Sequence, residues 1–360
     1  MVRLAGWWSW CCLVVGLSLA PAQVVAQESA AYHPLSAVLR IGAPRLVIGE
    51  EQRESPALFG QIRGVAVDAQ HHIYVLDASD HSVRRFAPSG AHIVSAGRSG
   101  RGPGDLADPY SLWHDGDHTL YVVDWVNGIN EFDTRDGQLV YRRRFAEGRG
   151  TMAVCRLRGQ FIAAGFHEGH ILHVIGASGD VVRSFGGAFR PDTNALVQKV
   201  ANTGSVVLTC DEAAGRLYVS QAAHGQVRSY NAAGDLLWET VLPGFQHSRV
   251  LRDSKGAVVV IFPKHLTEAI RPVGREHILV QAHHKERRME QDTARGILRP
   301  RRVEVDLGIL TYVVSARDGK VITRQYGGPF LVAGAGYDVV GYDDDPFPRV
   351  FILRVSTVVR

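Results

Sequence analysis

The sequence predicts an all-β fold, a six-bladed β-propeller of four-stranded antiparallel blades. Three observations lead to it: a repeated phrase, its spacing, and the alternation of residues within it. The phrase is an apolar tetrad, a polar turn and a second apolar strand, found at Ile73–Phe86, Leu120–Phe132, Phe161–Val174 and Leu217–Tyr230. Its copies begin 47, 41 and 56 residues apart, and a strand repeat of this length is typical of propellers. Alternation of period two within each copy indicates strands.

The first repeat supplies all four strands of one blade. Gly64–Asp68 is the first predicted strand, Ile73–Leu76 the second, Ser82–Phe86 the third and His92–Ala96 the fourth. A single sheet of this kind has two exposed edges and two exposed faces, so it is not stable alone. The sequence shows no helical pattern that could cover those faces, and radial stacking of blades buries them instead.

The fifth blade is predicted to be interrupted. Arg249–Phe262 has the pattern of its first two strands, and the later strands resume at Val303–Leu307 or Leu310–Ser315, followed by Lys320–Tyr326. The intervening residues 263–302 are interpreted as an inserted loop. They contain ten Lys or Arg against five Asp or Glu.

Long loops in compact domains are often lids or contact surfaces. We expect residues 263–302 to form a basic flap near the acidic turn Asp343–Asp345, either in contact with it or as part of an anion clamp. On this hypothesis, deletion of Glu268–Gly296 leaves the fold intact and alters ligand or partner binding.

The sixth blade is assigned to the C-terminus. Pro329–Gly341 and Arg349–Val355 supply its strands, with the turn Tyr342–Pro348 between the second and the third. Strand-forming residues at Val38–Ile48 are expected to close the ring by pairing with this blade. The predicted organisation is a signal peptide at 1–26, an N-terminal segment with a candidate ring-closing strand at 27–55, and the propeller at 56–360.

The N-terminus predicts export to the periplasm or secretion. Arg3 provides a positive start, Leu4–Leu19 is uncharged and largely apolar, and small-residue cleavage sites follow at Ala20–Ala22 and Val24–Ala26. These are features of a secretory signal peptide. An uncleaved membrane anchor is the alternative, because three tryptophans of the kind found at membrane interfaces lie in this stretch.

Composition limits the classes of partner. The chain has 360 residues, 46% of them hydrophobic, which is ample for a buried core and excludes a disordered protein. The net charge of +4 is spread along the chain, with no basic stripe that carries interleaved aromatic residues. We therefore expect no nucleic-acid partner, and membrane contact only through an uncleaved signal sequence.

Two cysteines, Cys155 and Cys210, remain outside the signal sequence. An exported protein could oxidise such a pair. A disulfide, however, requires a Cα separation below about 7 Å, and the inner strands of neighbouring blades are expected to diverge. We favour two free, half-buried thiols, with the disulfide as the alternative.

The first repeats resemble known propeller families. Phe59–Asp68, Ile73–Phe86 and the inter-blade run Gly97–Pro109 are similar to six-bladed propellers of NHL and TolB type, in particular to exported bacterial six-bladed β-propeller proteins. The likeness departs from the family pattern at Gly165, where blade three lacks an aspartate, and at Ser220–Gln221 in blade four. It implies a shape and little chemistry, because such families share a fold and differ in activity.

Candidate binding residues follow from the topology expected of a blade. The turn between strands two and three opens on the same rim as the connection to the next blade, and loops on a rigid scaffold often carry function. The residues predicted to bind a ligand at this rim are Asp77, His81, Arg98, Trp125, Asn127, His167, Glu168, His224 and Asp343.

Some of these residues have a structural interpretation as well. Asp77 and Asp124 end equivalent strands, and aspartate at such positions commonly accepts hydrogen bonds from the backbone of a turn. His167, His170 and His173 resemble a metal-binding set, but in a strand hairpin His170 and His173 point to opposite faces. No resident cofactor is expected, although Ca²⁺ or another divalent metal stays open.

Two functions are compatible with these features. One is an extracytoplasmic binding protein that holds a protein or small-molecule ligand at the channel rim and performs no chemistry. The alternative is a metal-dependent hydrolase or lyase of lactonase-like type, with Asp77, Asn127, His167 and Asp343 converging on a metal. No nucleophile motif is present, so the first function is favoured.

Overall fold

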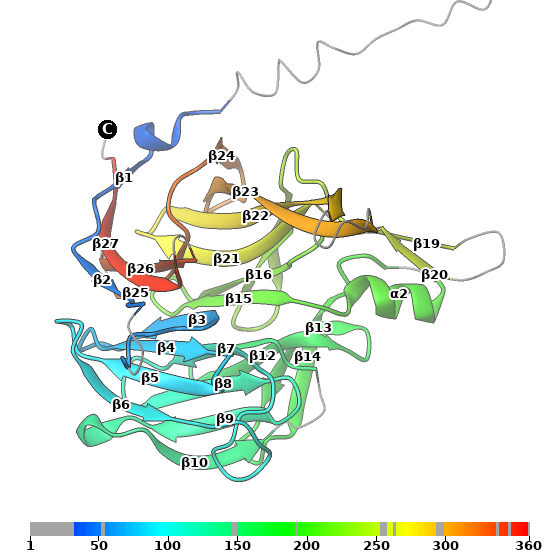
Figure 1. Cartoon of the computed structure of the whole chain (residues 1–360). Helices are drawn as coiled ribbons and strands as arrows, with labels where there is room; N and C mark the ends of the chain where they lie inside the picture. Colours follow the sequence, from blue (N-terminus) through cyan, green and yellow to red (C-terminus); the bar gives the residue numbers. More distant parts are fainter. Residues whose placement is uncertain are drawn as a thin grey trace, which may run out of the picture. The chain divides into compact units, whose positions relative to one another are not determined.

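Six antiparallel sheets follow one another along the chain and are arranged as the blades of a propeller (Figure 1). The computed structural model describes residues 32–51, 55–145, 150–191, 193–252, 258–261, 264–292, 299–335, 338–344 and 347–358, with the main chain alone over 251–261, over 285–306 and at 335. The predicted all-β, six-bladed fold class is confirmed. The predicted signal peptide, residues 1–26, lies outside the described residues.

The first four blades contain four consecutive strands each. Blade one is β3 (Ile62–Val67), β4 (Ile73–Asp77), β5 (Ser82–Phe86) and β6 (His92–Ala96). Blade two is β7 (Pro109–His114), β8 (Thr119–Asp124), β9 (Gly128–Asp133) and β10 (Val140–Phe145). Blade three is β11 (Ala153–Leu157), β12 (Gln160–His167), β13 (His170–Ile175) and β14 (Val181–Gly187). Blade four is β15 (Val206–Asp211), β16 (Arg216–Gln221), β17 (Gln226–Asn231) and β18 (Leu236–Val241).

The fifth blade differs from its predicted boundaries. It consists of β21 (His265–Val273), β22 (His277–Asp292), β23 (Arg299–Ser315) and β24 (Val321–Tyr326). The segment interpreted as its first two strands instead forms a separate two-stranded hairpin, β19 (Arg249–Arg252) and β20 (Val258–Ile261).

The segment 263–302 is therefore not an inserted loop where the structure describes it. Its first half supplies two strands of the blade, and Ile270, Ile278 and Val280 are buried in the core. Its second half belongs to an extension of the β22–β23 hairpin, paired from Lys285 with Asp306 to Asp292 with Arg299. A deletion of Glu268–Gly296 would remove core strands, so the prediction that it leaves the fold intact is wrong.

The sixth blade is completed by the two ends of the described chain. It contains β25 (Leu331–Ala335), β26 (Asp338–Asp343) and β27 (Arg349–Thr357). The fourth position is occupied by β1 (Leu39–Ile41) and β2 (Leu46–Ile48), which pair antiparallel with opposite halves of β27. Strands from the expected segment Val38–Ile48 thus close the ring.

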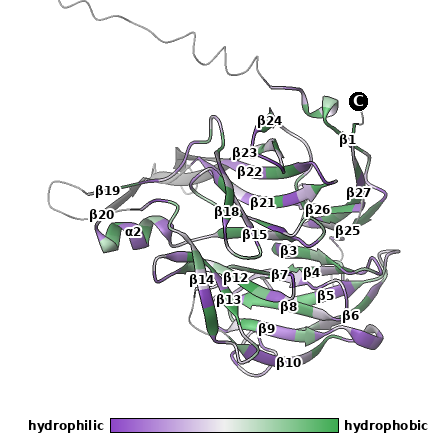
Figure 2. Ribbon diagram, turned by 180° about the vertical axis from the view of Figure 1, so that it is seen from behind, coloured by the Kyte–Doolittle hydropathy of each residue, from purple (hydrophilic) through white to green (hydrophobic). Residues whose placement is uncertain are grey.

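Each seam between neighbouring blades holds one hydrophobic cluster, because the second strand of a blade is buried on both faces. In β4, Tyr74 and Leu76 pack toward blade two, while Ile73 and Val75 pack toward blade six. Figure 2 shows hydrophobic residues along the strands and hydrophilic residues concentrated at the turns. Because successive side chains of a strand point to opposite faces, apolar residues along β4 contribute to the clusters on both sides of the blade.

Short helical segments lie between strands. A 3₁₀ turn, η1 (Leu35–Ala37), precedes β1, and a second, η2 (Arg135–Gly137), joins β9 to β10. The helix α2 (Ala195–Asn202), which the sequence analysis did not anticipate, lies in the connection from blade three to blade four. Asn194 caps it by accepting a hydrogen bond from the Val197 N–H. Among the described helices, none is long and apolar enough to span a membrane.

Candidate functional site

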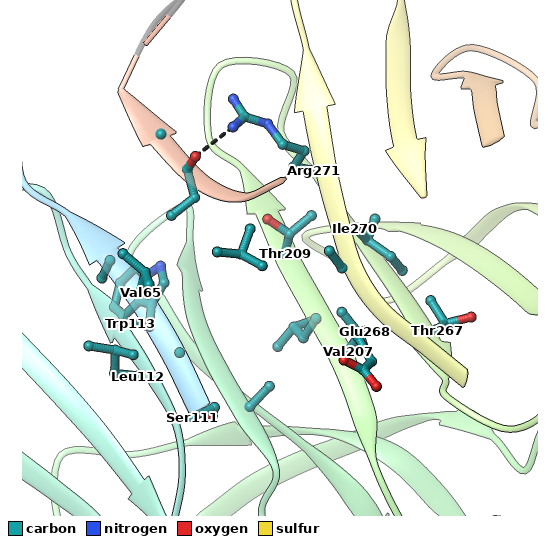
Figure 3. A pocket seen from close by; sticks show the side chains of 18 of the residues that line it. Val65, Ser111, Leu112, Trp113, Val207, Thr209, Thr267, Glu268, Ile270 and Arg271 are labelled. Atoms are coloured by element: carbon teal, nitrogen blue, oxygen red, sulfur yellow. Dashed lines mark hydrogen bonds between the residues drawn. The ribbon is translucent and has the colours of Figure 1, made fainter. Parts of the chain in front are cut away.

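A cavity of about 1050 Å³ extends along the inner strands of all six blades. These strands, β3, β7, β11, β15, β21 and β25, lie next to one another around the axis. Figure 3 shows part of the lining, with Val65, Leu112 and Trp113 facing Val207, Thr209, Glu268 and Arg271 across the space. The cavity is a central channel whose wall is mixed, with apolar side chains such as Val65, Leu112 and Val207 beside polar and charged ones.

Four inner strands carry the same irregularity near their first residue. In β3 the pairing steps from Ile62 with Asp77 to Gly64 with Leu76, which leaves Arg63 as an extra residue. Equivalent register shifts leave Tyr110 extra in β7, Glu268 in β21 and Val332 in β25. An extra residue of this kind is a β-bulge, which bends the strand and re-aims a side chain.

The bulges bring polar side chains from different blades to one end of the channel. All four extra residues line the cavity. Each inner strand begins at the rim where the turns between second and third strands open, so the bulges lie near that rim. The Tyr110 hydroxyl donates a hydrogen bond to the Ser205 hydroxyl, which joins blade two to blade four. His283 Nε2 lies 3.6 Å from Glu268 Oε2.

We define the mouth cluster as the polar cavity-lining residues at this end: Arg63, Tyr110, Ser205, Glu268, His283, Tyr342 and Asp344. Burial raises the pKa of Tyr342 far above its usual value, and the nearby negative charges of Glu268 and Asp344 raise it further. Burial also raises the pKa of Tyr110, against the lowering effect of its bond to Ser205. Both phenols therefore stay neutral and able to donate hydrogen bonds.

Arg271 lies deeper in the channel on the same strand as Glu268. Arg271 follows Glu268 by three positions on β21, which corresponds to about 10 Å of extended chain. The Arg271 side chain is only 9% exposed, and burial lowers its pKa to about 10. Figure 3 shows its guanidinium directed from β21 toward the neighbouring strand β25, with the hydrogen bond to the Ala333 carbonyl oxygen drawn.

The wall of the channel includes a disulfide. Cys155 on β11 and Cys210 on β15 are bonded, with Cα atoms 5.9 Å apart. The favoured interpretation of two free thiols is wrong, because the innermost strands of neighbouring blades are close together near the axis. Divergence between blades affects the outer strands instead.

The aspartates at the ends of β4 and β8 accept hydrogen bonds from the backbone of turns, which is their structural interpretation. Asp77 is buried and accepts hydrogen bonds from the backbone N–H groups of Gly60, Gln61 and Ser79. Asp124 accepts four equivalent bonds, from the N–H groups of Ala107, Asp108, Val126 and Asn127. Each carboxylate ties the segment that enters the inner strand to the turn after the second strand.

Other predicted site residues are also bonded within the fold. The buried Asn127 side chain donates to the carbonyl oxygens of Gly100 and Asp105. His224 is buried, and its Nε2 donates to the Ala201 carbonyl at the end of α2. Arg98 forms an ion pair with Asp105, and Asp343 forms one with Arg349 of its own blade.

The remaining predicted residues lie at turns. His81 has a left-handed backbone conformation, with φ of 58°. Trp125 is 41% exposed, and His167 Nε2 lies 3.7 Å from Glu168 Oε1. Of the nine predicted residues, none belongs to the described lining of the cavity. Within the described contacts, only the one between His167 and Glu168 joins two of the nine.

Two further expectations concern a metal site and the contact of the basic flap with the acidic turn. Over the described part of the chain, no group of three or more His, Cys, Asp or Glu side chains lies close enough to hold a metal ion. The expected contact of the basic flap with the acidic turn involves side chains of 285–302 and Asp345, which lie outside the described residues.

Most members of the mouth cluster occur in strands, whereas the sequence prediction considered turns. Asp344 belongs to the acidic turn that the sequence did indicate, and Ser205 directly precedes β15. A sequence signal does exist, because Arg63 and Glu268 are charged residues within inner strands, a position that alternation alone does not explain.

Comparison with known proteins agrees with this architecture. A family model of the NHL repeat matches residues 59–86, which contain β3 to β5. A Bacteroides fragilis protein described as exported has a similar structure, with a TM-score of 0.53 and 9% identity over 90% of this chain and 97% of that one. A member of the DUF4221 family from Bacteroides vulgatus has a TM-score of 0.55 and 7% identity over 89% of this chain and 99% of that one.

These identities support a likeness of fold alone. No curated protein matches the chain. The NHL match lies on blade one, and five further sheets continue the same architecture around the channel. The chain is a six-bladed β-propeller whose first blade matches the NHL repeat.

Proposed function

We propose that this protein is an extracytoplasmic binding propeller that holds a ligand at the mouth of its central channel. The observation that carries the proposal is the repeated bulge, which directs Arg63, Tyr110 and Glu268 from three different blades into one cavity. Irregularities of this kind are concentrated at functional sites. A purely structural channel would be filled by apolar side chains, which carry no cost of polar burial.

The cluster is suited to recognition by hydrogen bonds and charge. It offers a guanidinium, two neutral phenols, carboxylates and an imidazole at the end of a channel that also has apolar side chains. Ligand pockets commonly combine an apolar wall with a few convergent polar groups. The proposed ligand is a small molecule, or a slender segment of a partner protein, that enters the channel and meets these groups.

Export is part of the proposal. The N-terminal sequence has the features of a secretory signal. The Cys155–Cys210 disulfide fits an oxidising compartment such as the periplasm. The B. fragilis propeller of similar fold is also described as exported.

The test compares the effect on ligand binding of substitutions in the mouth cluster with that of substitutions in the turns at the rim. The chain beginning at Gln27 is screened by thermal shift against amino acids, dipeptides, nucleosides and sugars, and each hit is measured by calorimetry. Glu268→Gln and Arg63→Gln are expected to weaken binding of a hit roughly tenfold, the effect of losing a charged hydrogen bond. His167→Gln and Glu168→Gln are matched controls on the rim and should leave it unchanged.

Two results would contradict the proposal. If binding is lost in the rim variants and retained in the mouth variants, the site lies at the turn tips. If none of the compounds binds, the proposal fails for these small-molecule classes.

A further inference from the structure

Arg271 is a buried charge for which the described structure provides only main-chain partners. Its Nη1 donates to the Ala333 carbonyl oxygen at 2.6 Å, and its Nε lies 3.5 Å from the carbonyl oxygen of Pro272. Among the described ion pairs, none includes Arg271. A guanidinium has five N–H donors arranged as a planar fork, so these two contacts use only part of its capacity.

The charge is present at neutral pH. Burial lowers the pKa of the guanidinium to about 10, which still leaves it protonated at pH 7. Burying a charge without an opposite charge is costly, and buried charges in proteins are usually paired. An apolar side chain at this position would avoid that cost. Stability of the fold alone therefore does not account for an arginine here.

The fold makes room for the guanidinium. A Cβ added to Gly334 on the neighbouring strand β25 would lie 2.4 Å from the Asp338 carbonyl oxygen, and 2.9 Å from Nη1 and 3.0 Å from Nη2 of Arg271. Gly334 is therefore required first by the close approach of the Asp338 main chain, and it also lets the planar group lie close against β25. Figure 3 shows the group at the wall of the channel, with Thr209 on the adjacent strand β15 and Val65 on a strand across from it.

Among anions, the charges of the cavity disfavour a doubly charged ligand more than a singly charged one, because acidic side chains outnumber the arginines. The lining contains two arginines, Arg63 and Arg271, against four acidic residues, Asp211, Glu212, Glu268 and Asp344. A phosphate monoester carries about −1.5 to −2 at neutral pH, more charge than one guanidinium neutralises. A carboxylate carries a single charge and fits the guanidinium fork in a bidentate manner.

We propose that Arg271 is a binding residue that anchors the carboxylate of a monoanionic ligand with an apolar body, inside the channel and below the mouth cluster. This inference rests on the proposed function, since it requires that the channel admits a ligand. The apolar side chains of Val65, Val207 and Leu112 would contact the body of that ligand.

The experiment uses a matched series of probes on the chain beginning at Gln27. Hexanoate, hexanamide and hexyl phosphate share an alkyl body and differ in their head group. Calorimetry measures the binding of each probe to the wild type, Arg271→Met and Arg271→Lys. Arg317→Met, at an exposed arginine outside the cavity, is the control.

The wild type is expected to bind hexanoate saturably, in preference to both other probes. Arg271→Met should weaken hexanoate binding roughly tenfold or more, because it removes a charged hydrogen-bond donor. Arg271→Lys, which keeps the charge and loses the fork, should give an intermediate affinity. Without ligand, Arg271→Met should have an equal or higher melting temperature, because it removes an unpaired buried charge.

Several outcomes would overturn the inference. These are absence of hexanoate binding to the wild type, equal binding of hexanamide, or full binding by Arg271→Met. Tighter binding of hexyl phosphate would overturn the assignment to a carboxylate. If Arg271→Met does not fold, the comparison of probes on the wild type and Arg271→Lys decides.

Failure here is separable from failure of the proposed function. Loss of the Arg271 effect, with ligands that still depend on Glu268 and Arg63, would refute this inference alone. Dependence of every ligand on the rim residues would refute both.

Discussion

Cys155 on β11 and Cys210 on β15 form a disulfide that joins the inner strands of blades three and four. Cys210 also lines the central cavity, so the bond lies at the wall of the proposed binding channel. It connects two residues separated by 55 positions in sequence. The seam between these blades is thus held covalently as well as by its hydrophobic cluster.

Loss of this disulfide should lower stability. The double variant Cys155→Ala/Cys210→Ala is expected to lose about 2–4 kcal/mol of unfolding free energy, because a loop of this length is no longer constrained in the unfolded chain. Urea denaturation measures the effect. The wild type in a reducing agent should approach the variant, whereas equal midpoints with and without reductant would contradict the prediction.

Replacement of Asp77 should destabilise blade one without affecting the binding site. Asp77→Ala leaves the N–H groups of Gly60, Gln61 and Ser79 without their acceptor, and we expect a loss of about 2–4 kcal/mol. Asp117→Ala, at a side chain that is 77% exposed, is the control and should change stability by less than about 0.5 kcal/mol. Chemical denaturation distinguishes the two. A stable Asp77→Ala protein with impaired ligand binding would instead restore Asp77 as a site residue.

His224 should make stability depend on pH. Burial lowers its pKa to about 4 in the folded protein, below the value of about 6.5 for an unfolded histidine. The contribution of neutral His224 to the free energy of unfolding is therefore complete above pH 6.5 and is lost as the pH falls from 6.5 toward 4. By pH 5 the loss should be on the order of 2 kcal/mol.

The variant His224→Gln tests this dependence, because glutamine keeps an N–H donor for Ala201 and does not titrate. Denaturation between pH 7 and pH 5 should show a smaller slope than in the wild type. Burial also lowers the pKa of His265 to about 4, so part of the slope should remain. The exposed His118→Gln is the control, and profiles of His224→Gln and wild type that superimpose would argue against the assignment.

The extension of the β22–β23 hairpin should be dispensable for folding. Replacing residues 286–305 by Asn-Gly joins Lys285 to Asp306, which already face each other in the ladder, through a two-residue turn. The buried residues of these strands, such as Val280 and Leu310, are retained. We expect a change in unfolding free energy below about 1 kcal/mol. Circular dichroism and urea denaturation provide the measurement, and global unfolding would show that the extension supports the blade.

The blade architecture was predictable because local pattern and tertiary packing agree. Residues such as Tyr74 and Leu76 alternate with Ile73 and Val75, and the radial arrangement buries both sets. The fold class, the first four blades and the ring-closing segment could therefore be derived from period-two alternation and repeat spacing.

The parts that failed depend on pairing rather than on local pattern. The sequences of Arg249–Arg252 and Val258–Ile261 resemble those of blade strands. Only the hydrogen-bond pairing shows that, among the described strands, these two pair with each other and join no blade. The bulges at Arg63 and Glu268 are shifts of register between two strands, which one strand's sequence does not encode. For the same reason, the sequence did not indicate the residues that line the cavity mouth.

The pairing of β1 and β2 with β27 also bears on when the molecule can be completed. The five other blades lie between these two strands and β27 along the chain. The final sheet must wait until β27 has been synthesised, while the earlier sheets need no such distant partner. A protein built this way remains an open arc until β27 pairs with β1 and β2.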